Sequence, residues 1–193
     1  MQIERLYSPV GDLYVGISVA INENRLSKDE LISAATNLSN DLTAVQLLNA
    51  YLVVNTHHLL SAVQNAVNAW YGDYAQARSL DIEIAVYASG QKQIGRALGT
   101  FGVSEEVDRI AIVIVGTNKE TIAKCSRDLH ASIGPSPAVP FPPEESRFTA
   151  IMNHFNIDEL ELETIMDSND LSSIQEALSR CVASRVSSVA LES

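Results

Sequence analysis

Hydrophobic residues follow two patterns along the chain, one typical of strands and one typical of helices. Leu13–Ile21 is apolar and β-branched and predicts a strand, and residues 45–50 predict a second, shorter one. Arg109–Gly116 contains six apolar residues in succession, "IAIVIV". Because such a run fits a strand covered on both faces, we expect this strand to lie in the centre of its sheet.

Helical spacing of apolar residues dominates the remainder. It predicts a helix after the capping residue Ser27, and further helices over residues 55–71, 91–101 and 118–129, near 146–155 and 158–166, and from residue 172 onward. The uncharged polar side of 55–71 could pack against another protein. Residues 80–89, "LDIEIAVYAS", fit a helix or a strand equally well.

These elements predict an α+β fold, a mixed and mainly antiparallel sheet of about four strands flanked by helices. The chain has 193 residues, which suits one domain spanning 1–193. Five prolines fall within residues 134–145, so we expect an extended loop there without regular hydrogen bonding.

Composition narrows the possible functions. The chain is 46% hydrophobic and 19% charged, as folded proteins are. Its net charge of −11, with only 13 Lys and Arg residues, argues against binding duplex DNA. There is no signal-peptide pattern and no uninterrupted apolar run of membrane-spanning length, so we expect no membrane partner and a cytoplasmic location, or a nuclear one in a eukaryote.

The segment "GQKQIGRA", residues 90–97, comes close to a phosphate-binding loop. Arg96 and Ala97 stand where that loop requires Lys and then Ser or Thr, so the magnesium-binding hydroxyl is missing. A weaker anion site is conceivable, because Lys92 and Arg96 would lie one turn apart near a helix start. Both could equally be ordinary solvated charges.

Catalytic or metal-binding patterns are scarce elsewhere. Adjacent His57 and His58 would point about 100° apart on a helix and could not bind one metal together. The acid-rich run 158–163 is typical of a helix start, and Cys125 and Cys181 lack further metal ligands at a suitable spacing. We therefore predict no catalytic residue, no metal and no cofactor, and a protein that is not an enzyme.

Three stretches together carry a resemblance to a known family. They are "LLNAYLVVNTHHLLSAVQNAVNAW", "ARSLDIEIAVYASGQKQIGRALGTFGVSEE" and "IAIVIVG". In these the chain resembles the kinase-binding subunit of the KEOPS complex, which is called the PRPK-binding protein in animals. The resemblance covers residues 45–116 and continues weakly to "ASRVSSVAL" near the C-terminus. The chain departs from the family pattern in its longer proline-rich segment and in Gly95 and Gly99.

The resemblance implies a non-catalytic accessory subunit. KEOPS makes the threonylcarbamoyladenosine modification next to the anticodon of tRNA. Members of this family bind the small atypical protein kinase of the complex, meet its other subunits only through that kinase, and contact the 3′ CCA end of tRNA. The family's fold also implies that residues 80–89 are helical.

Site residues follow from what each partner requires. A single-stranded tRNA tail needs hydrogen-bond donors and a few cations, so we expect it to be bound by Arg78, Ser89, Gln91, Lys92, Gln93 and Arg96. A kinase interface needs exposed apolar side chains. The candidates, each of which competes with the core, are Ile94, Leu98, Phe101, Val182 and Val186.

Two other functions remain open at this point. One is a purely structural dimerisation module. The other is an enzyme that binds a nucleotide through the loop at residues 90–96.

Overall fold

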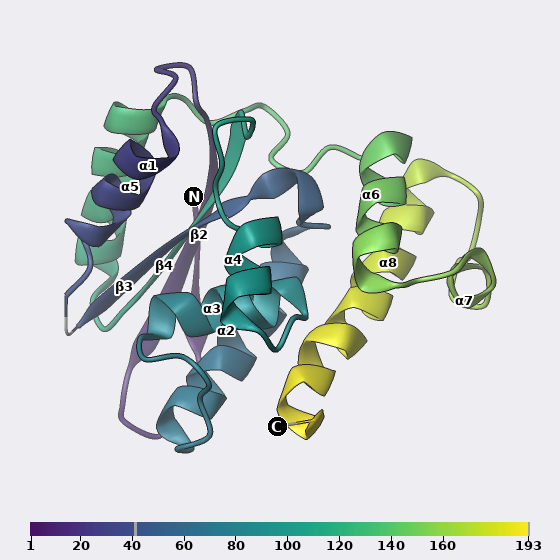
Figure 1. Ribbon diagram of the computed structural model, residues 1–193, viewed down its shortest axis with the longest axis horizontal. Helices are drawn as coiled ribbons and strands as arrows, with labels where there is room; N and C mark the ends of the chain where they lie inside the picture. Colours follow the sequence, from purple (N-terminus) through teal and green to yellow (C-terminus); the bar gives the residue numbers. More distant parts are fainter. Residues whose placement is uncertain (41, 193) are drawn as a thin grey trace.

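An antiparallel sheet forms the centre of the fold in the computed structural model, which describes residues 1–40 and 42–192 (Figure 1). Four strands are found among these residues, in the order β1-β2-β4-β3, and each neighbouring pair is antiparallel. Their bounds are β1 Gln2–Leu6, β2 Leu13–Ile21, β3 Thr43–Asn49 and β4 Arg109–Gly116. The predicted α+β class is confirmed, and β4 lies between two neighbours as predicted.

Strand β1 has no counterpart in the sequence prediction. Only Leu6 of its five residues is buried, because the strand lies at the edge of the sheet. It pairs with β2 from Gln2 opposite Ile17 to Leu6 opposite Leu13. A strand that is mostly solvated needs no apolar rhythm, so its pairing partner specifies it rather than its own pattern.

Helices cover both faces of the sheet (Figure 1). One face carries α1 and α5, and the other carries α2, α3 and α4, beyond which α6, α7 and α8 form a C-terminal unit. Within the described part of the chain, no helix is long and apolar enough to span a lipid bilayer. The bounds are α1 Lys28–Thr36, α2 Thr56–Tyr71, α3 Leu80–Ser89, α4 Ile94–Phe101, α5 Lys119–Ile133, α6 Glu145–Phe155, α7 Glu159–Glu163 and α8 Leu171–Ser188.

Two hydrophobic cores lie on opposite sides of the sheet. In β4, Ala111, Val113 and Val115 face the core beneath α2 and α3. The alternate residues Ile110, Ile112 and Ile114 face the core beneath α1 and α5. This double burial explains the unbroken apolar run of β4.

The ambiguous segment 80–89 is the helix α3, as the family resemblance implied. All residues from Glu83 to Ser89 are buried, because α3 packs against α2, α4 and α8. A helix that is buried all round over most of its length has no polar face there, so its sequence shows no helical periodicity.

Side chains that bind main-chain carbonyls attach the C-terminal unit. Arg147 of α6 is 1% exposed, and its guanidinium donates to the carbonyl oxygens of Tyr51, Val53 and Pro142. Gln175 of α8 donates in the same way to Val54 and Phe141, at 2.9 and 3.0 Å. Residues 51–54 and the proline-rich segment are thereby bound to the same unit.

Candidate functional site

The segment between α3 and α4, residues 90–93, is called the link and contains four of the positions around which the site was predicted. Gly90 ends α3 in the left-handed conformation, with φ of 63°, which glycine adopts without strain. A Cβ at Gly90 would lie 3.1 Å from the ring of Phe155, so the C-terminal unit packs directly on this turn. Gln93 is extended, and α4 begins only at Ile94.

Two histidines contact carbonyl groups at the end of α3. The backbone N–H of Val54 donates to Nδ1 of His58 at 3.3 Å, so the ring proton lies on Nε2, which donates to the carbonyl of Ala88 at 2.8 Å. Nε2 of His154 is 2.8 Å from the next carbonyl, that of Ser89. The two rings, with those of Phe101 and Phe155, form an aromatic cluster of edge-on and tilted contacts.

Burial keeps these imidazoles neutral. Desolvation lowers the pKa of His58 to about 4, outweighing the hydrogen bond to Ala88, and the nearby His154 also lowers it. Burial likewise lowers the pKa of His154, and the hydrogen bond to Ser89 opposes this effect. The two rings therefore act as neutral packing groups that position the link.

A polar pocket of about 190 Å³ opens beside the link. Its walls come from the start of the link, from the end of α6 and from the C-terminal part of α8. The lining includes Ser89, Gly90, Gln91, Lys92, His154, Phe155, Asn156, Arg185, Ser188 and Val189. Sequence reasoning missed the contribution of α6 and α8, because residues 60 to 100 positions away gave no local signal for it.

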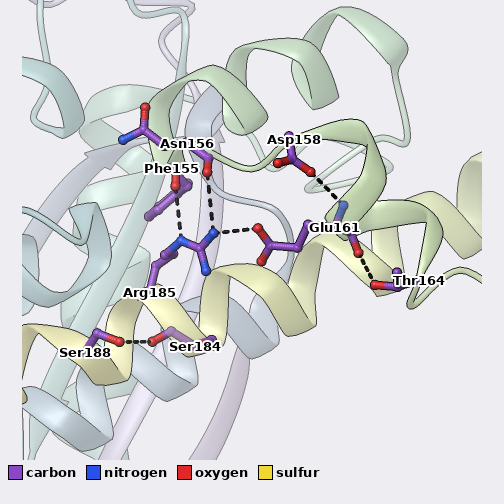
Figure 2. A network of polar contacts seen from close by, with 8 residues as sticks. All are labelled: Phe155, Asn156, Asp158, Glu161, Thr164, Ser184, Arg185 and Ser188. Carbon is purple, nitrogen blue, oxygen red and sulfur yellow. Dashed lines mark hydrogen bonds and ion pairs between the residues drawn. The ribbon is translucent and has the colours of Figure 1, made fainter.

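Arg185 ties α8 to the end of α6 and to α7 (Figure 2). Its guanidinium donates to the carbonyls of Phe155 and Asn156, at 3.3 and 3.4 Å, and forms an ion pair with Glu161 at 2.6 Å. Since these three acceptors engage it already, the arginine shapes the pocket wall more than it offers an open cationic site.

The structure brings together only some of the residues predicted to bind a tRNA tail. Gln91 and Lys92 line the pocket. Ser89 also borders it but is buried, with its hydroxyl donating to the carbonyl of Val86 and accepting from the N–H of Gln91. Arg78 and Arg96 are exposed and do not line the pocket.

The predicted helix start at Gln91 is wrong. Because Gly90 and Gln93 redirect the backbone, Lys92 precedes α4 and Arg96 lies within it. The two cations therefore do not share a helix face. Gln93 is exposed at the N-cap position and makes no side-chain capping bond.

A nucleotide-binding loop does not form at residues 90–96. Such a loop joins a strand to a helix, whereas here helix α3 precedes the link and Gly95 already belongs to α4. Among the described residues there is also no group of three or more His, Cys, Asp or Glu side chains placed to hold a metal ion.

The residues predicted for a kinase interface divide into two groups. Phe101, Val182 and Val186 are fully buried in the core and present no surface to a partner, so the core alternative holds for them. Ile94 and Leu98 are only partly buried on α4. On the polar side of α2, Gln64 accepts from the backbone N–H of Tyr7 and donates to its carbonyl, so this side holds the segment after β1.

Comparison with known families decides the assignment. The model of one family, described as kinase binding protein CGI-121, matches residues 20–190. The chain belongs to this family. The match extends from the end of β2 through α8, so it includes the link, the polar pocket and the C-terminal unit of this CGI-121 protein. No curated protein matches the chain.

Membership in the CGI-121 family confirms the predicted resemblance. It supports an accessory role in which the protein binds a protein kinase.

Proposed function

We propose that this protein is a non-catalytic accessory subunit of a KEOPS complex. In this role it binds and regulates the small atypical protein kinase of the complex and contacts the 3′ CCA end of tRNA. The observation that carries the proposal is the CGI-121 family match over residues 20–190. Contact with the remaining subunits is indirect and passes through the kinase.

The pocket beside the α3–α4 link supports contact with a single-stranded tail. Gln91 offers an amide that can pair with a base edge, and Lys92 supplies a cation at the same opening. Arg96 is exposed on α4, outside the pocket lining. With a net charge of −11, the protein can approach RNA only through a few phosphates. Two or three such contacts give a salt slope on the order of −1 to −2 for single-stranded RNA.

The tRNA contact is tested with a paired charge reversal. Lys92→Glu with Arg96→Glu should weaken binding of tRNA at least about tenfold, because each reversal replaces an attraction to phosphate by a repulsion. The melting temperature should change by less than about 2 °C, as for most surface substitutions. Fluorescence anisotropy with labelled tRNA measures the first quantity and differential scanning fluorimetry the second.

Two matched comparisons isolate the site. Lys124→Glu with Arg127→Glu changes the net charge equally on exposed positions of α5, on the opposite face of the sheet, and should leave tRNA binding nearly intact. A tRNA without its CCA end should bind the wild-type protein much more weakly. Equal affinity for the two RNAs would refute the proposed contact with the 3′ end.

Kinase binding is tested with the purified cognate kinase. Isothermal titration should give a saturable complex of one chain with one kinase, and the ATPase rate of the kinase should change when the complex forms. Absence of a complex, or turnover of a nucleotide by the isolated chain, would contradict an accessory role.

A further inference from the structure

A mainly apolar groove is lined by β3, which is an edge strand of the sheet, and by helices from both faces of the sheet. Its volume is about 440 Å³, and α1, β3, α3 and α4 all contribute to its lining. Val45, Gln46 and Leu47 are its buried residues in β3, and Leu98 lines it from α4. Ile32 of α1 lines it as well and is 45% exposed. The chain thus leaves hydrophobic surface in a concave place, which is typical of a binding site.

The α4 side of the groove is formed partly by bare helix backbone. Gly95 and Gly99 lie four residues apart and therefore on one face of α4, and a Cβ at either position would meet no atom within 4 Å. Neither has a positive φ, so no backbone conformation requires glycine there. Glycine weakens a helix relative to alanine, and no close packing by the described residues requires it at these two positions. An external segment that packs closely against the α4 backbone would offset it.

Opposite charges line the same groove. Lys28 at the start of α1 and Asp81 in the first turn of α3 both border it. Throughout the described chain, neither side chain forms a hydrogen bond or an ion pair. The groove therefore offers one positive and one negative group to whatever occupies it, and this pair can set the direction of a bound segment.

The edge of β3 is already engaged at both ends, which excludes an added strand along its length. Near its start, Asn40 bridges to Thr43 and the N–H of Val45 donates to the hydroxyl of Ser39 at 3.2 Å. Near its end, Leu48 bridges to Gly102. A helix does not need free backbone groups on its host, and it can place side chains into an apolar groove.

We propose that this groove receives one amphipathic helix of the protein kinase that the protein binds, with the helix axis passing over Gly95 and Gly99. The bound helix directs its apolar stripe toward Leu98 and Ile32. It carries a basic side chain near Asp81 and an acidic one near Lys28. The inference rests on the proposed kinase-binding function and adds to it the surface and the kind of segment that meet.

The test places a side chain in the open space beside Gly99 of α4. Gly99→Leu should weaken binding of the purified cognate kinase at least about 100-fold in isothermal titration, because the added side chain occupies the space of the partner backbone. Thr100→Leu places the same side chain at the neighbouring exposed position, outside the groove lining, and should bind within about threefold of wild type. Binding of tRNA should be unchanged in both variants, since the tail pocket lies elsewhere on the chain.

A second variant guards against an effect on folding. Ile32→Arg changes a rim residue that is already 45% exposed, so the fold should tolerate it while kinase binding falls at least about tenfold. If Gly99→Leu and Ile32→Arg both bind the kinase within about threefold of wild type, the groove is not the docking site, although the proposed function stands. If the wild-type protein itself binds no kinase, the proposed function fails and the groove assignment fails with it.

Discussion

The buried imidazole of His58 makes a sharp prediction about acid stability. Its ring is 0% exposed, and its pKa is lowered to about 4 from the ordinary value of 6.5. Above pH 6.5 the imidazole is neutral in both the folded and the unfolded chain, so it adds no pH dependence. As the pH falls below 6.5, the unfolded chain takes up the proton first and the folded state loses stability. This loss levels off below a pH of about 4.

The magnitude follows from the difference between the two pKa values. The full loss is about 3 kcal/mol of unfolding free energy, of which about 2 kcal/mol falls between about pH 7 and about pH 5. The structure supplies a direct reason for it. A second ring proton on Nδ1 would face the N–H of Val54, which now donates to that nitrogen, so protonation breaks the bond and opposes two donors.

The assay is urea unfolding followed by circular dichroism across this pH range, for the wild type and for His58→Gln. Glutamine is polar but does not titrate, so the variant should be less stable at neutral pH and should lose about 2 kcal/mol less than the wild type on acidification. Carboxylates and His154 titrate in both proteins and largely cancel from the comparison. Parallel profiles for the two proteins, or an NMR titration of His58 with an ordinary midpoint, would refute the reasoning.

Three further outcomes are expected. Arg147→Met should lower the unfolding free energy by about 3 kcal/mol, because it removes the donor to the carbonyls of Tyr51, Val53 and Pro142, of which that of Val53 is buried. A loss below about 1 kcal/mol in urea unfolding would contradict this. Gly99→Ala should stabilise the isolated chain by up to about 1 kcal/mol and raise its melting temperature, since open space surrounds the new methyl group; a lower melting temperature would argue for hidden crowding there. Asn118→Ala should lower the unfolding free energy by about 1 kcal/mol, because the side chain of Asn118 caps α5 by accepting from the N–H of Thr121 at 2.9 Å. An unchanged midpoint of urea unfolding would show that water replaces the cap.

The sequence predicted an element correctly where the element's own residues carry the pattern typical of its class. The apolar run of β4 reported burial on both faces, and Ser27 marked the start of α1 through a capping box with Glu30. Elements that depend on neighbouring elements could not be predicted from their own residues. Strand β1 depends on pairing with β2, and α3 is buried all round from Glu83 to Ser89, so neither shows the periodicity of its class.

The candidate site shows the same division. Gln91 and Lys92 were among the candidates because a single-stranded tail needs hydrogen-bond donors and cations, and both line the pocket. Local spacing could not predict that His154 and Arg185 complete the pocket, because the fold alone brings α6 and α8 to the α3–α4 link. The shift of the α4 start to Ile94 arose from two backbone conformations, at Gly90 and Gln93, that the helical rhythm does not report.

The way in which the C-terminal unit is attached affects which positions can change by mutation. Arg147 and Gln175 donate to the main chain of Tyr51, Val53, Val54, Phe141 and Pro142, and every amino acid carries a main-chain carbonyl. Substitutions at those five acceptor positions can therefore accumulate while the anchoring bonds persist, as long as the backbone path is kept. The two donors have no such latitude, so tolerance to mutation should be unequal on the two sides of this junction.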